Sequence, residues 1–128
     1  MKNFATNLVI CFFTLLLSSQ INATGFFGNS DSEEQSNLMA EAIKYAELAK
    51  THKAHPEEIH EYAKMSLEYI KKAEIQAIEH DNTQERTHIT ESLRHLVEAI
   101  KHARMGHARI ATEYIDDALV AMYQLTNN

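Results

Sequence analysis

From residue 29 to its end, the chain contains a single proline, Pro56, and a single glycine, Gly106. These two residue types are the strongest breakers of helices, so long segments of this part are open to helix formation. Alanine and larger apolar side chains recur there every three or four residues, which is the period of one face of an α-helix. Nothing reads as a β-strand. The sequence therefore predicts an all-α protein.

Four helices are expected, at about residues 33–53, 56–80, 84–105 and 107–126. The first ends before Pro56, because the residue preceding a proline avoids helical geometry, and proline itself suits the first position of the second helix. Residues 81–83 form the next break, and Gly106 ends the third helix. Short connections favour antiparallel neighbours, so we expect residues 33–126 to form an up-down-up-down four-helix bundle.

The two halves of the expected bundle are similar in sequence. Residues 41–46 (EAIKYA) recur as residues 98–103 (EAIKHA), with five identities in six positions. After each turn, His55 aligns with His107, and Tyr62 aligns with Tyr114. We interpret the bundle as two duplicated helical hairpins.

The N-terminal residues 1–23 have the pattern of a signal peptide. A short basic start is followed by an almost wholly apolar run at residues 8–17 and by small residues up to Ala23. An apolar run of about ten residues is shorter than the roughly twenty that a membrane-spanning helix needs. We therefore expect a periplasmic or secreted protein, with no membrane attachment after cleavage and a flexible leader at residues 24–32.

Composition limits the chemistry of the processed chain. Cys11 is the only cysteine and leaves with the signal peptide, which excludes disulfides and thiolate metal sites. The formal charge of −6 becomes −7 without Lys2, and such a surface repels nucleic acid and attracts cations. The chain has no recognisable nucleophile motif and no glycine-rich phosphate loop. We predict a binding protein, not an enzyme.

Histidine placement is the most unusual feature of the chain. His88, His95 and His102 are seven residues apart, so they form one stripe on the third helix, at the boundary between core and water. A neutral imidazole at that boundary can bind a transition metal, with a carboxylate as its partner. The alternative is a solvated face on which histidine and glutamate pair electrostatically.

More histidines are expected at one end of the bundle, because both hairpin turns of an up-down-up-down bundle lie at the same end. Three surround the first turn and two bracket the second, and ligation between hairpins is possible because neighbouring helix axes are about 8–10 Å apart. The alternative is that turns are polar and that histidine is common in them. The predicted metal ligands are His52, His55, His60, His95, His102 and His107.

A repeated motif connects these residues to a known family. Residues 95–102 (HLVEAIKH) fit a pattern close to His-Ala-x-x-Ala/Ser-aliphatic-x-His, and residues 45–52 and 62–69 match it with tyrosine replacing one or both histidines. In these motifs, over residues 40–122, the chain resembles the small metal-binding protein family. Members of that family are exported, histidine-rich four-helix bundles.

The resemblance implies periplasmic binding of divalent transition metals, copper(II) above all, with nickel or zinc possible. At pattern positions it carries over to His52, His95 and His102, and at the turns to His55 and His107. We expect metal ions as partners, no nucleic acid and a monomeric chain.

The tyrosine replacements support a second hypothesis. A fourth copy of the motif, residues 114–121, has no histidine, so the chain could be a helical interaction or stress protein that kept the bundle without metal binding. The tyrosines themselves are expected to be boundary residues whose hydroxyls reach water, not ligands. Copper should raise the unfolding midpoint under the first hypothesis and leave it unchanged under the second.

Overall fold

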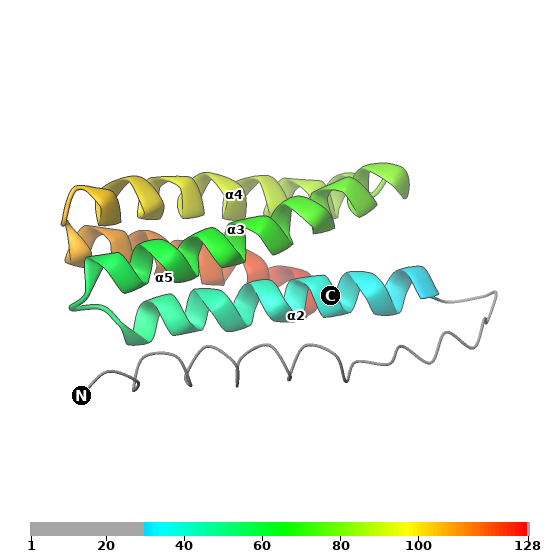
Figure 1. Cartoon of the computed structure of the whole chain (residues 1–128). Coiled ribbons are helices and arrows are strands. Elements are labelled where there is room, and N and C mark those ends of the chain that lie inside the picture. The colour runs from blue at the N-terminus through cyan, green and yellow to red at the C-terminus, as the bar shows by residue number, and fades with distance from the viewer. Residues whose placement is uncertain (1–29, 128) are drawn as a thin grey trace, which may run out of the picture.

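A computed structural model describes residues 30–127 of the chain. These residues form four helices, which are α2 (Ser30–Thr51), α3 (Pro56–Glu79), α4 (Thr83–Arg104) and α5 (Ala108–Thr126). Consecutive helices pack against each other, and α5 also packs against α2, which closes the bundle (Figure 1). Within the described residues there is no strand, and the predicted all-α four-helix bundle is confirmed.

Most helix boundaries lie within two residues of the expected ones. The larger difference is at the start of α2, which includes residues 30–32 that the sequence assigns to the flexible leader. That assignment is wrong for these three residues, because no glycine or proline follows Gly28 before Pro56 to keep the chain out of a helix. The predicted signal peptide and residues 24–29 lie outside the described residues.

Alanine supplies most of the buried core. The helices can approach closely because an alanine side chain is a single methyl group, and the larger fully buried side chains fill the spaces between these contacts. The buried alanines are Ala42, Ala46, Ala49, Ala63, Ala73, Ala77, Ala99, Ala103, Ala111, Ala118 and Ala121. The largest fully buried apolar side chains are Ile59, Ile70, Ile89, Leu96, Ile115 and Met122.

Two serines are also fully buried, and each satisfies its hydroxyl differently. The Ser66 hydroxyl on α3 donates to the carbonyl oxygen of Ala42 on α2 at 2.8 Å. The Ser92 hydroxyl on α4 donates within its own helix, to the carbonyl oxygen of His88 at 2.9 Å. Because a buried hydroxyl without a partner is costly, Ser66 ties the first two helices together at one fixed register.

The turns between α2 and α3 and between α4 and α5 lie at the same end of the bundle (Figure 1). Pro56 occupies the first turn of α3, where its missing N–H is not needed. Gly106 joins α4 to α5 with a φ of 77°, a conformation that favours glycine. We call this end, which contains residues 52–62 and 102–114, the turn end.

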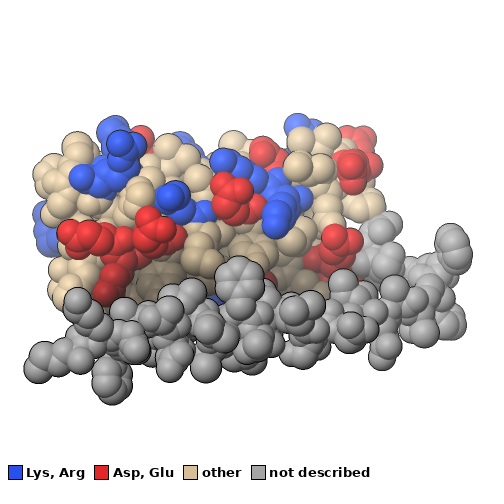
Figure 2. Space-filling model, viewed as in Figure 1, with Lys and Arg blue, Asp and Glu red and all other residues tan. Residues whose placement is uncertain are grey.

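No helix in residues 30–127 is both long and apolar enough to cross a membrane. Lysine, arginine and acidic side chains are interspersed over the face of the bundle shown in Figure 2. On this face, acidic side chains gather over the beginning of α3, whose first turn contains Glu57 and Glu58.

Candidate metal centre

Each of the two turns at the turn end contains a backbone hydrogen bond between two histidines. The amide of His55 donates to the carbonyl oxygen of His52 at 2.8 Å, and the amide of His107 donates to that of His102 at 2.9 Å. His55 and His107 are also the N-cap residues of α3 and α5. His52 and His102 therefore have corresponding roles in the two turns, although the hydrogen bond spans three residues in the first turn and five in the second, and His52 follows the end of α2 whereas His102 lies within α4.

Neither N-cap histidine uses its side chain to cap its helix. The imidazoles of His55 and His107 make no capping hydrogen bond, and both residues are exposed. Serine, threonine, asparagine and aspartate are the usual residues at this position, since their oxygens accept from the helix amides. The helix amides therefore do not occupy the nitrogens of these two imidazoles.

His52 and His102 are each covered by a tyrosine from the following helix. Tyr62 stacks on His52 with ring centres 5.2 Å apart and planes at 22°, and Tyr114 stacks on His102 at 5.5 Å and 14°. Both tyrosines are partly buried, as expected of boundary residues. The sequence reasoning missed their stacking on histidine. The signal was their common position, seven residues after the N-cap histidine of each helix.

His102 and His107 face each other across the second turn. Their Nδ1 atoms are 3.4 Å apart, and their rings are tilted by 34° with centres 5.7 Å apart. A metal–imidazole bond is about 2.0–2.1 Å long, so two ligands of a tetrahedral ion lie roughly 3.3 Å apart. The two nitrogens therefore match one edge of a tetrahedral site, and the exposure of His107 opens the other positions to solvent.

In the first turn the stacked histidine contacts a carboxylate from α3, and not the N-cap histidine. The Nδ1 atom of His52 is paired with the carboxylate of Glu58. His60 makes a separate pair with Glu61, at 3.1 Å from its Nδ1 atom. Since His60 precedes Tyr62 by two residues, it lies about 200° away around α3 and faces away from His52.

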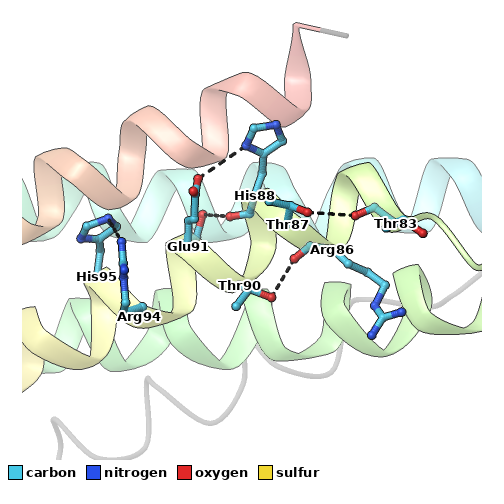
Figure 3. Close-up of polar contacts among 9 residues, drawn as sticks. Thr83, Arg86, Thr87, His88, Thr90, Glu91, Arg94 and His95 are labelled. Atoms are coloured by element: carbon cyan, nitrogen blue, oxygen red, sulfur yellow. Dashed lines mark hydrogen bonds and ion pairs between the residues drawn. The ribbon is translucent and has the colours of Figure 1, made fainter.

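The other two histidines of the α4 stripe lie along α5 (Figure 3). The Nδ1 atom of His88 is 3.7 Å from Glu91, and that of His95 is 3.9 Å from Asp117 on α5. Both nitrogens are buried without a hydrogen-bond partner. The side chain of His95 is 20% exposed and its ring lies 6.2 Å from that of Tyr114. The stripe therefore occupies the boundary between core and water.

The turn-end histidines do not converge on one point, which differs from the expected single gathering of five. Among residues 30–127, no group of three or more histidine, cysteine, aspartate or glutamate side chains is placed to hold one metal ion. His95 is two helical turns, roughly 10 Å, from His102 along α4. The structure thus brings together His102 with His107 and His52 with Glu58, whereas His60 pairs with Glu61 and His95 lies beside Asp117.

The two pairs also differ in the charge around them. Residues 52–62 contain one lysine and three glutamates, a formal charge of −2, whereas residues 102–114 contain two arginines and one glutamate, a formal charge of +1. The formal charge of the first turn therefore favours cations more than that of the second.

Comparison with known protein families agrees with this chemistry. A family model described as small metal-binding protein matches residues 1–125, a range that contains all eight histidines. No curated protein matches the chain.

Proposed function

Since the chain belongs to the small metal-binding protein family, we propose that it sequesters divalent transition metal ions, copper(II) foremost, at the histidines of its turn end. The observation that carries the proposal is the pair of His102 and His107, whose Nδ1 atoms lie 3.4 Å apart. Nickel(II) and zinc(II) are the alternative ions, because imidazole suits all three. The observed separation fits a tetrahedral zinc(II) site directly, whereas a tetragonal copper(II) or nickel(II) site needs the two nitrogens to approach by about 0.5 Å. The role is binding and not catalysis.

The pair works as a ligand when both rings are neutral and carry their protons on Nε2, so that both Nδ1 lone pairs face the ion. Tyr114 covers one face of the His102 ring and limits its rotation, which reduces the entropy lost on binding. Protons compete with the metal for the same nitrogens, so acid should release the ion. Water or exogenous groups complete the coordination.

The proposal keeps the other predicted ligands as secondary positions. His52, His55, His60 and His95 each offer one further imidazole at or near the bundle surface. A periplasmic location is part of the proposal and is supported by the signal-peptide pattern of residues 1–23. The negative formal charge of the chain, −6, favours cations over anions as partners.

Calorimetric titration of the purified protein with copper(II), repeated with nickel(II) and zinc(II), tests this function. We expect saturable binding at micromolar or tighter dissociation constants, and at least tenfold weaker binding when His102 and His107 are both replaced by alanine. His80→Ala is the matched control, because His80 is an exposed histidine at the other end of α3. A parent protein that binds none of the three ions would instead support the helical interaction or stress protein.

A further inference from the structure

In the first hairpin the tyrosine-stacked histidine contacts a carboxylate, whereas in the second it faces the N-cap histidine. We propose that His52 and Glu58 form a second metal site, with one imidazole nitrogen and one carboxylate oxygen as ligands. This inference rests on the proposed function, and it adds Glu58 as a ligand and a second ion with a different donor set. It means that the duplicated hairpins have diverged in the ions that they hold.

Structural equivalence is the first argument. The backbone carbonyls of His52 and His102 each accept a hydrogen bond from the N-cap histidine of the next helix, and each ring is covered by the tyrosine seven residues beyond that N-cap. In each hairpin, the Nδ1 atom of the covered ring faces a second metal-binding side chain. That side chain is His107 in one hairpin and Glu58 in the other.

The second argument is that the pair can admit an ion. Glu58 contacts His52 directly, and ligands on one metal ion are roughly 3 Å apart because each bond is about 2.0–2.2 Å. To bind an ion between them, the Glu58 carboxylate must therefore move away from the His52 ring until the two ligand atoms are roughly 3 Å apart. The Glu58 side chain is 49% exposed, so solvent and not the core surrounds it in that direction. The stacked Tyr62 keeps the His52 ring in place meanwhile.

Charge is the third argument. The formal charge of −2 over residues 52–62 lowers the energy of a divalent cation there, whereas the pair of His102 and His107 lies in a segment of charge +1. A site with one nitrogen and one oxygen ligand suits zinc(II) as well as copper(II). The attraction at the first turn is in part between the cation and glutamates that are exposed to solvent. Because salt screens exposed charges, it should weaken this site more than the two-histidine site.

Zinc(II) titration of three proteins tests the inference: the parent, Glu58→Gln and Glu57→Gln. Glu57 is the control, because it removes the same charge from the same first turn of α3 but lies about 100° away around the helix. We expect Glu58→Gln to bind one ion fewer per chain than the parent, and Glu57→Gln to bind the parental number. His52→Ala should lose the same ion as Glu58→Gln, and raising the salt concentration should weaken that ion first.

The outcomes separate this inference from the proposed function. If Glu58→Gln keeps the parental number of ions, or if Glu57→Gln loses one as well, the site at His52 and Glu58 is wrong while the two-histidine site stands. If the double alanine variant of His102 and His107 loses no ion but Glu58→Gln does, the second site stands and the first fails. If the parent protein binds neither zinc(II) nor copper(II), both proposals fail.

Discussion

The imidazoles of His102 and His107 face each other with their Nδ1 atoms 3.4 Å apart, one from the last turn of α4 and one from the N-cap of α5. The turn between them sets this distance. The His107 amide donates to the carbonyl of His102 at 2.9 Å, and Gly106 reverses the chain with its positive φ of 77°. The ligand pair is therefore a product of the hairpin turn and not of one helix face.

Gly106→Ala should destabilise the bundle by about 1 kcal/mol, because a residue with a Cβ atom is strained at positive φ. The cost is a backbone effect alone, since a Cβ atom at this position would meet nothing within 4 Å. Urea unfolding measures it. Gly106→Asn is the control and should cost less, because asparagine tolerates the left-handed region. An alanine variant as stable as the parent would contradict the role of this glycine.

Tyr114→Leu should weaken metal binding at His102 and His107, because leucine removes the ring that stacks on His102. Aromatic pairs contribute about 0.5–1.5 kcal/mol beyond their buried area, so we expect a loss of affinity of roughly two- to tenfold. Tyr114→Phe keeps the ring and should bind like the parent. Competition with a chelator of known affinity measures the difference. Equal losses in both variants would show that the hydroxyl, not the ring, matters.

Ser66→Ala should lower the free energy of unfolding by about 1–2 kcal/mol, because it removes a fully buried hydrogen bond between α3 and α2. Ser92→Ala is the matched control, since its equally buried hydroxyl donates only within α4. Because the Ser92 hydrogen bond joins no second helix, we expect this change to cost less. Thermal and urea unfolding measure the loss of stability in each variant. A larger loss in Ser92→Ala than in Ser66→Ala would contradict the role of Ser66 between the two helices.

Tyr123 should titrate at higher pH than an ordinary tyrosine. Its hydroxyl donates to the carboxylate of Glu47 on α2, and this hydrogen bond, with burial and the nearby negative charge, raises the pKa of Tyr123 above its usual value of 10.0. The folded state thus holds the phenol proton more tightly than the unfolded state. The contribution of the contact to stability is present below pH 10 and is lost as the pH rises through the higher folded pKa.

Absorbance at 295 nm, recorded during an alkaline titration, checks this expectation. Tyr123→Phe should remove the component that titrates last, and Glu47→Gln should move that component to lower pH. An unchanged titration curve in Glu47→Gln would contradict the assignment.

The fold could be predicted from the sequence because its signals are local. The three-four spacing of apolar residues, Pro56, Gly106 and the break at residues 81–83 define four helices, and short connections leave few ways to pack them. The largest difference is at the start of α2, at residues 30–32, where a polar stretch without glycine or proline is compatible with either a leader or a first helical turn.

The pairing of the histidines could not be predicted, because it depends on turn geometry and side-chain rotation. The repeated motif aligns residues 45–52 with residues 95–102 and so pairs His52 with His102, but it does not show which side chain each ring contacts, because the two turns differ in length. The alignment of residues 41–46 with 98–103 even pairs Tyr45 with His102, one heptad away from the structural match. The contact between Glu58 and His52 could not be read from the repeat, because the second hairpin has Ile110 at the position that aligns with Glu58.

The most direct test of the account is to observe which imidazole nitrogens bind the metal. Long-range proton–nitrogen NMR spectra of the histidine rings, recorded with and without zinc(II), report this atom by atom. We predict that the Nδ1 resonances of His102 and His107 shift together to metal-bound values, that their protons reside on Nε2, and that His80 does not respond. Saturable zinc binding that leaves both rings unchanged, or that uses their Nε2 atoms, would contradict the site.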